Sequence, residues 1–350
     1  MMKKITIGLM MMMGLAGCSS DPSDNGGTSG VKTVTLNIPV EVYTGNEEVT
    51  GRAASQGDPG NDVNFKAPLY LYIYAYIAEG TDGTSHELLT QTFTYSTDAD
   101  ASSAWTLKDE STTNERWQKN VRVTFKLSSS FYDKLGCSRV FAIASYQDIS
   151  SLLPKDAEDA VTQFSSLEKF QDYTCNFENI ASNDLKDIYS TPYNDHSTPY
   201  QSTDNGLIVG ADGTLTCSTV KLYHVAAKVD FTWEVATSLQ STTEIASITC
   251  TGVPTTCKIF EPTDNPTTAT ANCLVLGSSS DSATPITEVN AGNKWLGRAY
   301  AYVLQPSGGA INYTVTYGGT SGKQATTATF APTSVNNVFT GWYRIIATVK

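Results

Sequence analysis

The sequence predicts an all-β protein made of two antiparallel β-sandwich domains in tandem. Apolar and polar residues alternate in many short runs, and turn-forming residues separate these runs, which is typical of antiparallel sandwiches. The 350 residues exceed one average domain, and hydrophobic residues, at 40%, suffice to build cores. Helical periodicity is sparse, and one short helix is expected within residues 156–171.

The N-terminal segment predicts export. Lys3 and Lys4 precede an apolar stretch, residues 5–17, that is too short to remain in a bilayer as a spanning helix. It ends in the residues LAGC at positions 15–18, which resemble a bacterial lipobox. Residues 1–17 are therefore expected to be a lipoprotein signal peptide. The alternative is an ordinary secretory signal that happens to contain a cysteine.

Cys18 is the expected lipidation site, where fatty acyl chains such as palmitate would be attached. Ser19 and Ser20 follow it in place of the aspartate that retains some lipoproteins at the inner membrane. An outer-membrane lipoprotein is therefore expected, with the lipid on Cys18 as its anchor. Residues 18–30 are rich in Gly, Ser and Asp and are expected to form a flexible tether.

Residues 33–42 are the clearest strand of the N-terminal half. Period-two alternation predicts that one of its faces is buried, and the side chains on that face are Val34, Leu36, Ile38, Val40 and Val42. Pro39 has no N–H to donate to a neighbouring strand. The strand is therefore expected at a sheet edge, or where one of its sides is unpaired.

The next strand, residues 69–77, places tyrosines on one face at positions 70, 72, 74 and 76. This face either binds sugars by stacking, with help from Trp105 and Trp117, or packs under another element. Further strands are expected at 121–127, 140–145, 214–220, 226–235, 245–250, 295–304, 311–317 and 342–349. The loop 189–213 is rich in turn-forming residues, so the domains are expected to span 31–213 and 214–350.

The cysteines permit disulfides. There are 7, and Cys18 is assigned to the lipid, which leaves an even number in an exported chain. Cys250 and Cys257 flank a turn with Gly and Pro between two apolar runs, so they could face each other across a hairpin. The alternative is that all the remaining cysteines are small buried hydrophobic residues.

Charge and motifs narrow the functional classes. A net charge of −12 and a pI of about 4.7 argue against a nucleic-acid partner. The sequence has no H-E-x-x-H, G-x-S-x-G or P-loop motif. A non-enzymatic protein without a metal or cofactor is therefore expected, although a glycosidase carboxylate pair would leave no sequence signature.

Three segments in order resemble the fimbrillin family, the lipoprotein-derived pilins of gut and oral anaerobes. They are residues 66–72 (KAPLYLY), 139–145 (RVFAIAS) and 222–230 (LYHVAAKVD), and residues 190–193 and 336–343 also fit. The resemblance implies two transthyretin-like β-sandwich domains. It also implies a structural pilin that serves adhesion, polymerises with other pilin subunits by donor-strand exchange, and passes from the outer membrane to a fimbrium.

The resemblance further implies proteolytic processing. Members of the family are cut after an arginine, which releases the first strand together with the lipid. Arg52 is the one Lys or Arg between Lys32 and Lys66, so cleavage is expected at Arg52–Ala53, with strand 33–42 as the removable strand. The alternative is that Arg52 is a solvated loop residue.

The candidate donor strand lies at the C-terminus, where apolar residues again alternate. Its inward residues would be Tyr343, Ile345, Ala347 and Val349. This segment could equally be the ordinary last strand of the second domain. The alternative function is an uncleaved cell-surface adhesin or glycan-binding lipoprotein, acting as a tip, accessory or anchor component with a host or glycan ligand.

Overall fold

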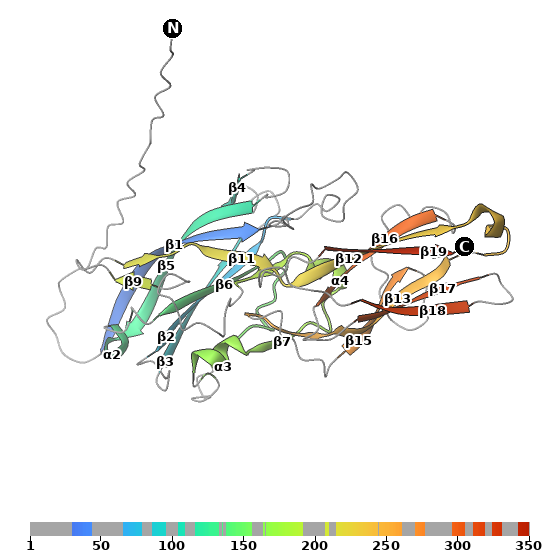
Figure 1. The fold of residues 1–350 in the computed structure, drawn as a ribbon. Helices are drawn as coiled ribbons and strands as arrows, with labels where there is room; N and C mark the ends of the chain where they lie inside the picture. The colour runs from blue at the N-terminus through green and yellow to red at the C-terminus, as the bar shows by residue number, and fades with distance from the viewer. Residues whose placement is uncertain are drawn as a thin grey trace, which may run out of the picture.

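The computed structural model is nearly all-β, as the sequence predicts (Figure 1). The residues that it describes are 30–43, 66–78, 86–95, 104–108, 116–132, 135, 138–155, 164, 166–191, 207–209, 215–243, 245–260, 270–276, 296–304, 311–318, 324–330 and 342–349. Within these ranges no helix is long and apolar enough to cross a membrane.

One sheet of eight strands forms the N-terminal part, in the order β3-β2-β6-β8-β11-β1-β5-β4. Its strands are β1 (Val31–Tyr43), β2 (Tyr70–Ala78), β3 (His86–Thr94), β4 (Thr106–Lys108), β5 (Arg116–Ser128), β6 (Arg139–Ser145), β8 (Ile188–Ser190) and β11 (Val220–His224). The sheet turns a corner at β11, whose first residues pair with β1 and whose last residues pair with β8. The curled sheet encloses a core, as a β-sandwich does.

That core lies between β1 and β5 on one side and β2 and β6 on the other. The inward apolar residues of β1 share one buried cluster with those of β2, such as Leu71 and Ile73, and with Val123 of β5. The clean alternation of these strands is the reason, because every second side chain points to the same face.

The opposite face of β2 and β6 is covered by short elements: α3 (Leu167–Gln171), β7 (Thr174–Asn176) and α4 (Ser182–Leu185), which follow one another along the chain. Ser166 caps α3, its Oγ accepting a hydrogen bond from the main-chain N–H of Lys169 at 3.2 Å. The expected helix at 156–171 is thus confirmed over Leu167–Gln171, and residues 156–163 and 165 lie outside the described residues. Two further short helices are α2 (Ser129–Tyr132) and η2 (Thr237–Leu239).

The C-terminal part contains a three-stranded sheet, β16-β12-β19, and a four-stranded sheet, β15-β13-β17-β18. Their strands are β12 (Ala226–Val235), β13 (Ile245–Pro254), β15 (Thr270–Leu276), β16 (Leu296–Leu304), β17 (Ile311–Tyr317), β18 (Gln324–Phe330) and β19 (Trp342–Val349). Two small ladders complete the fold, β9 (Leu207–Val209) with β10 (Leu215–Cys217), and β7 with β14 (Thr256–Lys258). Figure 1 shows the two parts as separate groups of strands, with α4 and β7 between them.

The chain passes from one part to the other through β11 and β12, with Val225 between them. The sheet partners therefore change between His224 and Ala226, beyond the expected boundary at 213–214. One buried cluster runs through both parts, from Tyr72 of β2 to Val315 of β17. The division into two tandem domains stays a prediction.

Candidate functional site: the first strand and its groove

The first strand lies inside the eight-stranded sheet. All 13 residues of β1 pair antiparallel with β5, and Val40–Val42 also pair parallel with Val220–Leu222 of β11. Among the described residues the pairing with β11 begins only after Pro39, which has no N–H to offer. The prediction of an edge strand is therefore wrong. The alternative prediction, a strand with one side unpaired at the proline, describes β1.

The inward face of β1 is buried from Val34 to Val42. The relative exposures are 4% for Val34, 2% for Leu36, 0% for Ile38, 1% for Val40 and 0% for Val42. Burial of one such side chain contributes about 1.5–3 kcal/mol, so the five together contribute on the order of 10 kcal/mol. Removal of β1 would therefore expose a large apolar surface to water.

Polar contacts hold the C-terminal end of β1. The side-chain amide of Gln118 donates a hydrogen bond to Oε1 of Glu41, and the hydroxyl of Tyr43 donates to Oε2 of the same carboxylate at 2.8 Å. The ring of Tyr223, in β11, stacks on the ring of Tyr43. These contacts fix the end of the strand between β5 and β11.

The segment that follows β1, with Arg52 and Ala53, lies outside the described residues, as does Cys18. The chain is described again from Lys66. The main-chain N–H of Lys66 donates to Oδ1 of Asp187 at 3.4 Å, and its ammonium lies 4.0 Å from the centre of the Tyr146 ring. Both ends of the segment that contains Arg52 are therefore held by contacts within the fold.

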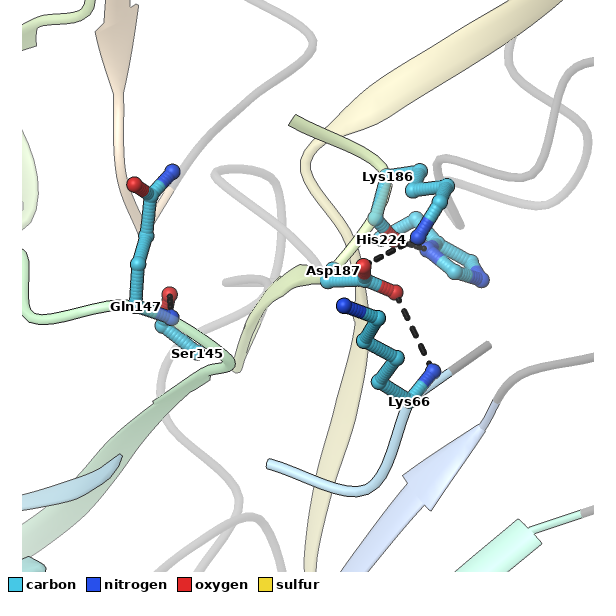
Figure 2. A network of polar contacts seen from close by, with 6 residues as sticks. All are labelled: Lys66, Ser145, Gln147, Lys186, Asp187 and His224. Atoms are coloured by element: carbon cyan, nitrogen blue, oxygen red, sulfur yellow. Dashed lines mark hydrogen bonds and ion pairs between the residues drawn. The ribbon is translucent and has the colours of Figure 1, made fainter. Parts of the chain in front are cut away.

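Asp187 belongs to a buried polar network (Figure 2). Its other carboxylate oxygen pairs with the ammonium of Lys186, and Nδ1 of His224 donates to the carbonyl oxygen of Lys186 at 2.8 Å. Asp187 is 4% exposed and Lys186 8%, and burial raises the pKa of the Asp187 carboxyl. The network joins the start of β8 to the end of β11, where the chain leaves the first sheet.

Sequence reasoning did not assign this network. One feature of the sequence could have indicated it, namely a histidine inside an apolar run. His224 lies between Tyr223 and Val225 in the segment that carries the family resemblance. A polar side chain in such a run is buried with its strand and needs a hydrogen-bond partner.

The tyrosine face of β2 is covered at Tyr72, Tyr74 and Tyr76, whereas Tyr70 is half-buried. Tyr72 and Tyr74 are each 3% exposed and Tyr76 is 0% exposed. The ring of Tyr74 packs against Phe170 of α3 and against Phe260, with centroids 5.7 and 5.9 Å apart. The expectation that this face packs under another element is confirmed.

The two tryptophans offered as sugar platforms lie at the other core, the one that β1 and β5 share. Trp105 is 3% exposed, and its indole N–H donates to the carbonyl oxygen of Pro68 at 3.1 Å. Trp117 is partly buried and packs against the N-terminal core. The rings of Tyr72, Tyr74, Tyr76 and Trp105 are therefore not open to a stacking ligand.

Cys250 and Cys257, the expected disulfide pair, do not face each other across a hairpin. The chain does not fold back as a hairpin after Pro254: β13 pairs with β15 and β17, whereas β14 pairs with β7. Cys250 therefore lies opposite Cys273, and Cys257 lies opposite Cys175. The prediction fails because tertiary pairing, and not the short turn, selects the partner of each strand.

The candidate donor residues Tyr343, Ile345, Ala347 and Val349 all lie in β19. This strand is at the edge of its three-stranded sheet and pairs parallel with β12, from Lys228 opposite Trp342 to Val235 opposite Val349. Within this subunit it occupies the place of a last strand. Its use as a donor to another subunit stays a prediction.

The sequence matches no family profile and no curated protein. Among solved structures, the fold is similar to a proposed cell adhesion protein from Parabacteroides distasonis, with a TM-score of 0.45, 13% identity, and coverage of 89% of this chain and 88% of the other.

Two further structures are similar over most of their length. One is a tip fimbrial protein from Porphyromonas gingivalis with a C-terminal truncation, with a TM-score of 0.39, 11% identity, and coverage of 85% and 82%. The other is a proposed cell adhesion protein from Bacteroides eggerthii, with a TM-score of 0.39, 11% identity, and coverage of 89% and 86%. The three structures are of adhesion and fimbrial proteins.

Proposed function

We propose that this chain is a surface-exposed fimbrial subunit that serves adhesion and is exported as an outer-membrane lipoprotein through Cys18. Cleavage at Arg52–Ala53 frees β1, and a strand from a neighbouring subunit takes its place. The observation that carries this proposal is the position of β1. The strand nearest to the lipidated end of the chain fills the groove between β5 and β11, and its apolar face is buried throughout.

A single cut at Arg52 would be enough to separate β1 covalently from the rest of the fold. After cleavage at Arg52, β1 would be joined to the lipid through residues 18–30 and to the rest of the fold by non-covalent contacts alone. Lys66 would remain fixed by Asp187 and Tyr146, so the new N-terminal segment would start from an anchored point. Because the empty groove would expose a large apolar area, its filling by another strand is strongly favourable.

The pairing of β1 supports one orientation for the incoming strand. A donor in the place of β1 would run parallel to β11 and antiparallel to β5. β19 already runs parallel to β12, which continues directly from β11. We propose β19 as the donor because its residues from Tyr343 to Val349 alternate in the same way. The partner would be a second copy of this chain or another pilin subunit.

The decisive experiment treats the purified precursor with an arginine-specific protease at low dose. We expect a single early cut at Arg52–Ala53, shown by N-terminal sequencing, followed by a ladder of multimers on a non-denaturing gel. Arg52→Gln is the matched control and should remain monomeric. A second control lacks residues 342–350 and should be cut without forming multimers.

Two results would contradict the proposal. One is resistance of Arg52 under conditions that cut an unfolded substrate, which would favour an uncleaved surface adhesin. The other is a complete cut that leaves β1 bound and the protein monomeric at high concentration.

A further inference from the structure

Two buried cysteines from distant parts of the sequence face each other in one small ladder. β7 and β14 pair antiparallel, with Cys175 directly opposite Cys257. Main-chain hydrogen bonds close both ends of the ladder, from Phe177 N–H to the Thr255 carbonyl at 2.8 Å and from Ile259 N–H to the Tyr173 carbonyl at 3.3 Å. The register of the two cysteines is therefore fixed on both sides.

Both thiols point to the same side of this ladder. Cys175 and Cys257 are each 0% exposed and belong to the same buried cluster, whereas their neighbours along each strand are exposed or half-buried. In an antiparallel pair, residues directly opposite each other project to the same face with Cα atoms about 4.5–5.5 Å apart. This separation lies within the range of about 4.4–6.8 Å that a disulfide bridges.

We propose that Cys175 and Cys257 form a disulfide bond in the exported protein. The bond would join β7, which covers the N-terminal sheet, to β14, which leads from β13 of the C-terminal part. Figure 1 shows β7 between the two groups of strands. The main chain crosses between the parts through β11 and β12, so the disulfide would be a second covalent connection at this junction. The proposal shares the export step with the proposed function and does not depend on strand exchange.

The reaction is a thiol–disulfide exchange. The two thiols lose two protons and two electrons as the S–S bond forms, and a protein disulfide of an oxidoreductase in the export compartment accepts them and becomes a dithiol. Burial raises the pKa of the Cys175 thiol, and the nearby Cys257 adds to this effect. Since the thiolate is the attacking species, the bond should form during folding, before the core closes over the pair.

Peptide mapping tests the bond directly. The full-length protein, exported from a bacterial host and purified without reductant, is denatured, alkylated with N-ethylmaleimide and digested with trypsin. We expect a linked pair of peptides, 170–186 and 229–258, that separates on reduction. Because the second peptide also contains Cys250, a Cys250→Ala variant should retain the link and a Cys257→Ala variant should lose it. Alkylation of both Cys175 and Cys257 before reduction, or a link from either to another cysteine, overturns the proposal.

Thermal unfolding of the Cys250→Ala variant tests the bond independently. This variant is used because Cys250 also lies opposite a cysteine, Cys273, and could form a disulfide of its own. Reductant should lower the Tm by about 5–10 °C because the bond closes a long loop. Cys175→Ala and Cys257→Ala should each abolish this shift. Cys217→Ala is the matched control, since Cys217 pairs with Leu207, and should retain it. A reductant effect that is absent, or equal in all variants, contradicts the proposal.

Discussion

The ring of Tyr43, the last residue of β1, stacks on the ring of Tyr223 in β11, with centroids 5.0 Å apart and planes 14° apart. This pair closes the end of the groove that holds β1, on the side where the chain continues toward Arg52. An aromatic pair of this kind contributes about 0.5–1.5 kcal/mol beyond the area that it buries. The stability of β1 in its groove should therefore depend measurably on Tyr43.

Tyr43→Ala should lower the free energy of unfolding by about 3 kcal/mol, because it removes a buried ring and the hydrogen bond to Glu41. Tyr43→Phe keeps the ring and should cost about 1 kcal/mol. Urea denaturation of the uncleaved protein measures both values. Equal losses in the two variants would show that the stacking with Tyr223 contributes nothing.

Ile38→Ala should cost about 2–5 kcal/mol, since Ile38 is fully buried at the centre of the inward face of β1. Asn37→Ala is the matched control on the exposed face of the same strand and should change stability by less than about 0.5 kcal/mol. Urea denaturation again provides the measurement. If the control were as costly as Ile38→Ala, the assignment of the two faces would be wrong.

Phe260→Ala should cost about 3–5 kcal/mol. Its fully buried ring packs on Phe170 with centroids 4.8 Å apart, and it also contacts Tyr74 and Phe141 of the N-terminal sheet. Because one core runs through both parts of the chain, we expect the unaltered protein to unfold in a single calorimetric transition. The Phe260→Ala variant should separate that transition into two. Two transitions already present in the unaltered protein would contradict this view of the junction.

Asp148 should make stability depend on pH. The main-chain N–H of Ser150 donates to Oδ1 of Asp148 at 2.9 Å and holds the pKa of the carboxyl below its ordinary value, with help from the Tyr72 hydroxyl. A lowered pKa means that the stabilisation is fully present above the ordinary Asp pKa, about 3.9. It is lost as pH falls through the folded-state pKa.

The variant Asp148→Asn keeps an oxygen acceptor and loses the charge. We expect it to be less stable than the unaltered protein at pH 6, with the difference disappearing at acidic pH. Urea denaturation at a series of pH values measures this difference. A constant difference across the series would assign the effect to packing and not to ionisation.

Local alternation was enough to predict many of the long strands, although β3, β15 and β18 were not expected. Residues 226–235 and 311–317 were expected as strands and appear as β12 and β17 with the same bounds. The pattern succeeds because a period of two is a property of the strand itself and needs no knowledge of its neighbours. The expected strand 214–220, in contrast, is divided between β10 and β11, which have different partners.

The shortest strands carried no such signal. β7 and β14 have 3 residues each, too few for a periodic pattern. They exist because the chain on either side brings them together. Their pairing then decides which cysteine faces which, so the partner of Cys257 could not be read from the turn after Cys250.

The sequence by itself determined the all-β class, the buried face of β1, and the motifs that predict a lipid on Cys18 and a cut at Arg52. These features depend on residues that are close together in the chain. Only the tertiary structure decided that β1 lies inside a sheet, that Asp187 and His224 share one buried network, and that Cys175 faces Cys257. The physical reason is that each of these relationships joins segments far apart in sequence, and their contact depends on how whole sheets pack.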